Sequence, residues 1–167
     1  IDGRCNQDCD FCNILDEGGS DFTSQTGYVK RMLRQIASVK PHDAVVNFTG
    51  GEPTLRKDLV MLVAYAKHLG IDRVVLQTNA IRFKSKRYLD ALMRAGLDDA
   101  LISFHSHDAS ISDLMTRAPG TWDKTYQGIR NALDAGLQVS LNSVISRDNL
   151  ETFGETMDYA IEHFPEL

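Results

Sequence analysis

The sequence predicts an α/β protein built around a parallel sheet, either as an open sheet or as part of a barrel. Helical stretches alternate along the chain with short apolar runs, and three of the joints between them contain a glycine, at Gly70, Gly96 and Gly136. Each glycine stands where a helix needs a left-handed closing residue. The apolar runs are continuous, which is typical of parallel strands buried on both faces between crossover helices.

The order of the expected elements follows from the same pattern. Four strands are expected, at residues 44–48, 73–76, 100–104 and 139–145. Apolar residues at helical spacing predict helices over residues 29–39, 59–69, 88–93, 122–133 and, with a less regular pattern, 157–164. A long polar loop is expected from His105 to Gly120. In either architecture the chemistry belongs at the carboxyl ends of the strands, and the polar clusters of this sequence stand there.

Composition and charge narrow the classes of function. The chain has 167 residues, with 18 Lys and Arg against 23 Asp and Glu, so its formal net charge is -5. A weakly acidic domain is a poor candidate for binding the negatively charged nucleic-acid backbone, so nucleic acid is not an expected partner. No apolar run reaches the roughly 20 residues of a membrane span, and we expect a soluble, cytoplasmic protein without a membrane partner. Residues 1–167 are expected to form one incomplete domain of a longer chain.

All three cysteines, Cys5, Cys9 and Cys12, fall in one short segment. A disulfide framework would spread an even number of cysteines along the chain, so this cluster indicates metal ligation in a reducing compartment. A closed zinc site needs four ligands, whereas an iron-sulfur cube held by three cysteines leaves one iron open to a small molecule. The alternatives are a zinc loop completed by a residue outside this sequence, or three unligated thiols.

Two motifs in the same order resemble those of a known superfamily. The spacing Cys-x3-Cys-x2-Cys, with Phe11 directly before the last cysteine, resembles the cluster loop of the radical S-adenosylmethionine (radical SAM) enzymes. After the first expected strand, Gly50-Gly51-Glu52-Pro53 resembles the GGEP segment of that superfamily. The resemblance implies a partial (β/α)6 TIM-like barrel whose first strand and last unit are truncated here. Residues 49–58 resemble the branch that modifies peptides or builds complex cofactors, the molybdenum-cofactor type among them.

The resemblance implies that the three cysteines are the catalytic and metal-ligating residues. They would hold a [4Fe-4S] cluster whose fourth iron is chelated by S-adenosylmethionine. Gly50 and Gly51 lack side chains and would let the ligand approach the backbone closely. Glu52 would accept a charge-assisted hydrogen bond from the methionyl ammonium, and Pro53 would turn the chain out of the strand.

Further cofactor contacts are implied at the other strand ends. Phe11 resembles the aromatic residue that packs near the adenine. Thr78-Asn79-Ala80 resembles the family's TNG segment, with alanine in place of the usual glycine. Ser103 matches a position that often contacts the ribose or the methionyl group, and Asn142 lies in a run that resembles the family's N-T-V-I pattern. Short polar residues at strand ends can instead satisfy neighbouring backbone groups, which is the alternative for Thr78, Ser103 and Asn142.

The implied reaction begins with one electron from a low-potential donor of flavodoxin or ferredoxin type. The electron cleaves S-adenosylmethionine to methionine and a 5′-deoxyadenosyl radical, which abstracts hydrogen from a peptide or small-molecule substrate. Outside the family motifs, His105 and His107 lie on the same side of an extended segment after the third strand and are candidates for substrate contact, as is Arg147. The alternative function is a non-enzymatic metal-binding module, such as a zinc-stabilised or iron-sulfur sensor domain.

Overall fold

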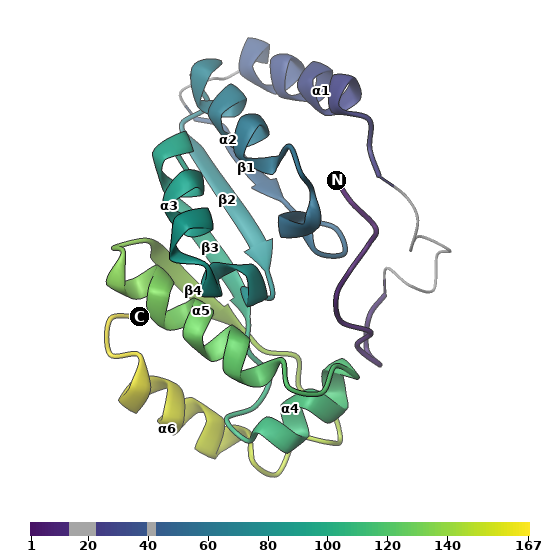
Figure 1. Ribbon diagram of the computed structural model, residues 1–167, viewed down its shortest axis with the longest axis vertical. Coiled ribbons are helices and arrows are strands. Elements are labelled where there is room, and N and C mark those ends of the chain that lie inside the picture. The colour runs from purple at the N-terminus through teal and green to yellow at the C-terminus, as the bar shows by residue number, and fades with distance from the viewer. Residues whose placement is uncertain (14–22, 40–42) are drawn as a thin grey trace.

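In the part of the chain that the structure describes, four parallel strands form a sheet in the order β1-β2-β3-β4 (Figure 1). The computed structural model describes residues 1–13, 23–39 and 43–167. The strands are β1 (Val45–Phe48), β2 (Arg73–Thr78), β3 (Asp99–Ser103) and β4 (Gln138–Asn142). Each strand pairs with the next one along the chain in parallel register. The predicted α/β class and the parallel sheet are therefore confirmed.

Among the described residues, all five expected helices are present together with one more. The helices are α1 (Thr26–Val39), α2 (Leu59–His68), α3 (Lys86–Ala95), α4 (Ala109–Thr116), α5 (Trp122–Asp134) and α6 (Phe153–His163), with 3-10 turns η2 (Pro53–Leu55) and η3 (Ile81–Lys84). Within the described ranges, none of the helices is long and apolar enough to cross a membrane.

Helix α4 lies inside the segment that was expected to be a loop, so that prediction was wrong. The side chain of Asp108 caps the helix by accepting hydrogen bonds from the amides of Ser110 and Ile111, at 2.7 and 3.3 Å. Met115 is buried while Leu114 is exposed. The helix therefore has no continuous apolar stripe for pattern analysis to detect.

The three glycine joints share one backbone geometry. Gly70, Gly96 and Gly136 have φ angles of 82°, 101° and 77°, in the left-handed region that glycine adopts without strain. The residue after each glycine donates its amide to a carbonyl in the last helical turn, as Leu97 does to Leu92 at 3.0 Å. This is the hydrogen bond of the Schellman motif, and it turns each helix directly into the next strand.

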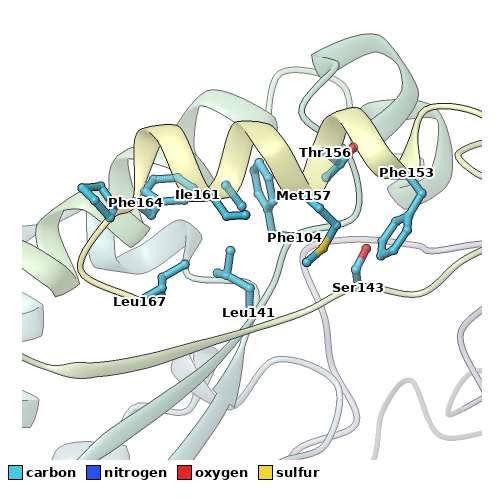
Figure 2. Close-up of a pocket in the computed structure, with 11 residues that line it drawn as sticks. Phe104, Leu141, Ser143, Phe153, Thr156, Met157, Ile161, Phe164 and Leu167 are labelled. Atoms are coloured by element: carbon cyan, nitrogen blue, oxygen red, sulfur yellow. The ribbon is translucent and has the colours of Figure 1, made fainter.

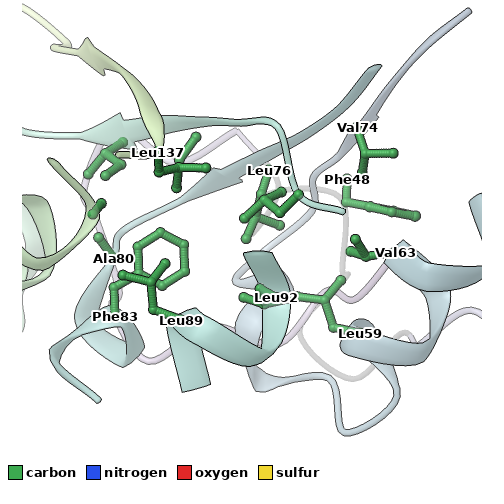
Figure 3. Packing of buried hydrophobic residues seen from close by; sticks show 14 of the residues in the cluster. Phe48, Leu59, Val63, Val74, Leu76, Ala80, Phe83, Leu89, Leu92 and Leu137 are labelled. Atoms are coloured by element: carbon green, nitrogen blue, oxygen red, sulfur yellow. The ribbon is translucent and has the colours of Figure 1, made fainter. Parts of the chain in front are cut away.

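The two faces of the sheet are covered differently, which corrects the expectation that the strands are buried on both faces. Alternate side chains such as Val74 and Leu76 are fully buried against the helices (Figure 3). The opposite face is half-exposed and carries polar residues, Ser103 among them. Val75 and Leu101 also lie on that second face, and they are the reason that the apolar runs looked continuous.

Residues 1–4 lie beside the end of β1 and follow the same direction, in the region where the resemblance places the opening strand (Figure 1). The amide of Gly51 donates to the carbonyl of Asp2 at 2.6 Å, and the amide of Glu52 donates to the carbonyl of Arg4 at 2.7 Å. These backbone hydrogen bonds fix the chain just before the cysteine segment.

Candidate functional site

A pocket of about 340 Å³ lies at the carboxyl ends of the four strands and collects most of the predicted site residues. It is lined by Cys5, Gln7, Cys9, Phe11, Cys12, Asn13, Gly50, Gly51, Glu52, Gln77, Thr78, Asn79, Ser103, His105, Asn142 and Val144. We call it the strand-end pocket. All predicted cofactor residues except Pro53 line it, and so does His105, whereas His107 and Arg147 do not.

Helix α4 and the turn after it hold the cysteine segment. The amides of Asp8 and Asp10 donate to the carbonyls of Thr116 and Met115 at the end of α4, at 2.9 and 3.2 Å. Gln7 Nε2 donates to the hydroxyl of Thr121 at 3.3 Å. The helix that sequence patterning missed therefore positions the cysteines.

The three cysteines form a donor set that fits a polynuclear, cationic group. The pKa of the Cys9 thiol is raised to about 12, chiefly by burial and also by the neighbouring Cys5 and Cys12. Thiolates at these positions repel one another, so all three need a cationic group between them. An iron-sulfur cluster held by three cysteines meets that need. Across residues 1–13, 23–39 and 43–167, no three His, Cys, Asp or Glu side chains are arranged to hold a single metal ion.

The buried carboxylate of Glu52 joins the ends of β1 and β2. Its Oε1 accepts hydrogen bonds from the amide and the hydroxyl of Thr54, at 2.9 and 2.6 Å, and from the hydroxyl of Thr78 at 2.8 Å. Its Oε2 accepts from the amide of Asn79 at 2.8 Å. Burial raises the pKa of Glu52, while these hydrogen bonds act in the opposite direction. Oε1 therefore accepts three hydrogen bonds from the chain and Oε2 accepts one.

Asn79 connects the end of β2 to the cysteine segment. Its Nδ2 donates to Asn6 Oδ1 at 2.7 Å, and its carbonyl accepts from the hydroxyl of Thr125 at 2.9 Å. The next residue, Ala80, has a φ of 58°. Ala80 therefore adopts the left-handed conformation that glycine takes more readily, and Gly128 of α5 packs directly against its carbonyl.

The structure explains why the first two residues of the GGEP segment are glycines, which the sequence alone did not. A Cβ atom on Gly50 would lie 2.3 Å from the carbonyl oxygen of Asp2, and one on Gly51 would lie 2.4 Å from that of Arg4. The chain's own amino-terminal segment makes the close approach that was expected of a ligand. Pro53 is buried and is the first residue of η2, the turn by which the chain leaves the end of β1.

Ser103 and Asn142 lie side by side at the ends of β3 and β4, where they are direct register partners. Both are half-buried and line the strand-end pocket. Gln77, which the sequence analysis did not select, lies on the same face of the sheet and accepts a hydrogen bond from the Thr49 hydroxyl at 3.2 Å. Because side chains alternate between the faces of a strand, its position two residues before Asn79 could have indicated that it points to the same side.

The three candidates for substrate contact have different surroundings. His105 is buried, and its ring meets Phe11 edge-on with 4.8 Å between the centroids. His107 instead packs against α6, where its Nδ1 lies 3.0 Å from the hydroxyl of Thr156. Arg147 is exposed after β4. Of the three, His105 is the one that the fold brings to the cysteines.

Asn149, which was not predicted from the sequence, is fully buried next to the backbone of His105 and Val144, two residues of the pocket lining. Its Nδ2 donates to the carbonyls of His105 and Val144, at 2.7 and 2.9 Å, and its Oδ1 accepts from the amide of Ser146 at 2.8 Å. Asn149 thereby ties the segment after β3 to the segment after β4. No spacing or motif distinguishes it from other loop asparagines.

A second cavity, of about 280 Å³, lies between α6 and β4 (Figure 2). Its lining is mainly apolar and includes Leu141 and Ser143, but none of the cysteines. These two residues alternate along the chain with Asn142 and Val144, which line the strand-end pocket. The end of β4 therefore separates the apolar cavity from the polar site.

Comparison with known proteins agrees with the family resemblance of the two sequence motifs. The family model described as the Radical SAM superfamily matches residues 2–160. A probable GTP 3′,8-cyclase of Sulfurisphaera tokodaii is 32% identical over 159 residues, covering 95% of this chain and 49% of the relative. Another, from Saccharolobus islandicus, is 35% identical over 150 residues, covering 88% of this chain and 46% of the relative. The chain thus spans about half the length of these curated relatives.

Solved structures share the fold. Native anSMEcpe with bound AdoMet and Kp18Cys peptide superposes with a TM-score of 0.81 at 15% identity, covering 96% of this chain and 46% of that one. BtrN in complex with AdoMet and 2-DOIA gives a TM-score of 0.62 at 17% identity, covering 86% and 54%. These likenesses confirm the predicted part of a TIM-like barrel. With the family model covering nearly its whole length, the chain belongs to the radical SAM superfamily, whose enzymes use a [4Fe-4S] cluster and S-adenosylmethionine.

Proposed function

We propose that residues 1–167 are the incomplete core domain of a radical SAM enzyme, with its cofactors in the strand-end pocket. The observation that carries the proposal is that the three cysteines and the polar residues from four strand ends line one pocket. In this proposal Cys5, Cys9 and Cys12 hold the [4Fe-4S] cluster. A reducing compartment such as the cytoplasm suits these free thiols.

The other pocket residues would bind and orient S-adenosylmethionine. Glu52 is already held by the chain's own donors, so its remaining Oε2 lone pair is the acceptor that we assign to the methionyl ammonium. Phe11 offers a flat apolar face for the adenine. Ser103 and Asn142 offer neighbouring polar side chains on the exposed face of the sheet. When bound and reduced, the cluster supplies the electron that cleaves S-adenosylmethionine to methionine and a 5′-deoxyadenosyl radical, which abstracts hydrogen from substrate.

The electron donor and the substrate come from outside this domain. Cys5 is exposed, which supports direct approach by a low-potential protein of flavodoxin or ferredoxin type. The expected substrates are a small molecule or a peptide. We select GTP for the first substrate test, because the curated relatives named above are probable GTP 3′,8-cyclases.

The test is electron paramagnetic resonance on the full-length protein, reconstituted anaerobically with iron and sulfide and reduced with dithionite. We expect a reduced-cluster signal that shifts when S-adenosylmethionine is added and is lost in Cys9→Ala. Incubation with GTP should then increase the 5′-deoxyadenosine formed per cluster. A cluster signal that ignores S-adenosylmethionine, or binding of zinc alone, would support the metal-binding module instead.

A further inference from the structure

The ring of His105 is fixed by a hydrogen bond to the backbone after β4. Its Nδ1 accepts from the amide of Val144 at 3.1 Å. The backbone of His105 is also held, because its carbonyl accepts from Nδ2 of the fully buried Asn149 at 2.7 Å. The ring therefore has a fixed position in the wall of the strand-end pocket.

This hydrogen bond decides which ring nitrogen carries the proton. A backbone amide can only donate, so Nδ1 of His105 must be unprotonated, and the proton of the neutral ring lies on Nε2. Burial lowers the pKa of His105, which is about 4 although the charge of Asp10 acts in the opposite direction. The ring is therefore a neutral donor at physiological pH.

The Nε2–H group has no hydrogen-bond partner in the part of the chain that the structure describes. The same ring meets Phe11 edge-on at 4.8 Å, and in the proposed function Phe11 packs near the adenine. No lysine or arginine is among the described residues that line the pocket. Acceptor atoms of a ligand next to Phe11 therefore find no lysine or arginine donor among these residues, which leaves neutral donors such as an imidazole N–H.

Resting on the proposed function, we propose that His105 binds S-adenosylmethionine by donating its Nε2–H to an acceptor atom beside the adenine-packing Phe11. In this role His105 neither transfers a proton nor attracts an anion. It adds a directional hydrogen bond, and its edge contact fixes the orientation of the Phe11 ring.

Two amide variants separate the two nitrogens of the ring. In His105→Asn, Oδ1 takes the place of Nδ1 and still accepts from the Val144 amide, but the donor at the Nε2 position is gone. In His105→Gln, the amide nitrogen reaches the Nε2 position and restores the donor. His107→Asn is the control, because His107 lies outside the pocket lining.

The measurement is the dissociation constant of S-adenosylmethionine for the reconstituted full-length protein, by equilibrium dialysis, with iron content and melting temperature recorded for each variant. We expect His105→Asn to weaken binding about tenfold, the scale of one net hydrogen bond. His105→Gln should stay within about threefold of wild type, and His107→Asn should bind as wild type does.

Two results would overturn this inference, and they differ from each other. If wild type binds and its cluster signal shifts while His105→Asn binds equally well, the proposed function stands and His105 has no role toward S-adenosylmethionine. An acceptor on the substrate would give this result. If wild type itself does not bind S-adenosylmethionine, the proposed function fails and the inference fails with it.

Discussion

The carboxylate of Glu52 accepts a 2.8 Å hydrogen bond from the backbone amide of Asn79, across two neighbouring strand ends. In Glu52→Gln, one oxygen becomes an NH2 group that faces donors from the chain. We expect the free energy of unfolding to fall by about 1–3 kcal/mol, measured by urea denaturation. Glu151→Gln, at an exposed position, should leave it unchanged. Equal stability of the two variants would contradict the bridging role of Glu52.

Gly51→Ala should disturb the cysteine segment through the backbone. The new Cβ would lie 2.4 Å from the carbonyl oxygen of Arg4, directly before Cys5. We expect a loss of about 1–3 kcal/mol in stability and a lower iron and sulfide content after reconstitution. The matched control is Gly27→Ala in α1, where nothing lies within 4 Å of the added atom. Normal iron loading of Gly51→Ala would show that residues 1–4 do not position the cysteines.

Gly128→Ala tests the contact between α5 and the turn after β2. Alanine normally stabilises a helix interior relative to glycine by up to about 1 kcal/mol. Here the added Cβ would lie 2.2 Å from the carbonyl oxygen of Ala80, so we expect a lower melting temperature. Gly154→Ala in α6 has open space around it and should raise the melting temperature. If both variants are stabilised, α5 does not pack against the turn in this way.

The buried His105 should make the protein less stable in acid. Its pKa is about 4 in the fold and about 6.5 in the unfolded chain, so the unfolded chain takes up this proton first as the pH falls. Stability should therefore fall between about pH 6.5 and pH 4, by roughly 3 kcal/mol at most. His105→Asn has no titrating ring and should lose this part of the pH dependence, as measured by urea unfolding at pH 7 and 4.5. A histidine far from the pocket, His68, provides the control as His68→Asn, which should keep the wild-type difference.

Much of the fold could be predicted because its signals are local. The glycine joints mark helix ends whose hydrogen bonds form within six residues, so the sequence contains the whole motif around Gly96. Helix α4 was not predicted because it has no apolar stripe. It is held instead by the cap at Asp108 and by its contact with the cysteine segment. Packing between distant segments leaves no such pattern.

The same distinction applies to the site. The cysteines and the GGEP segment could be selected because each is a compact motif. The reason why Gly50 and Gly51 must be glycines could not be predicted, because the atoms that exclude a Cβ belong to residues about 48 positions earlier in the chain. Asn149 and the fixed tautomer of His105 depend on hydrogen bonds between segments after different strands. Only the folded backbone brings those groups together.

The attachment of residues 1–13 has a consequence for the order of folding. Neighbouring strands of the sheet are consecutive along the chain, whereas the amides of Asp8 and Asp10 donate to carbonyls more than 100 residues away. Contacts between distant residues form late, because closing a long loop costs chain entropy. We therefore expect the cysteine segment to dock last, onto a sheet that is already formed. Iron and sulfide would then meet thiols that are still open to solvent, and docking of the segment would close the loaded site.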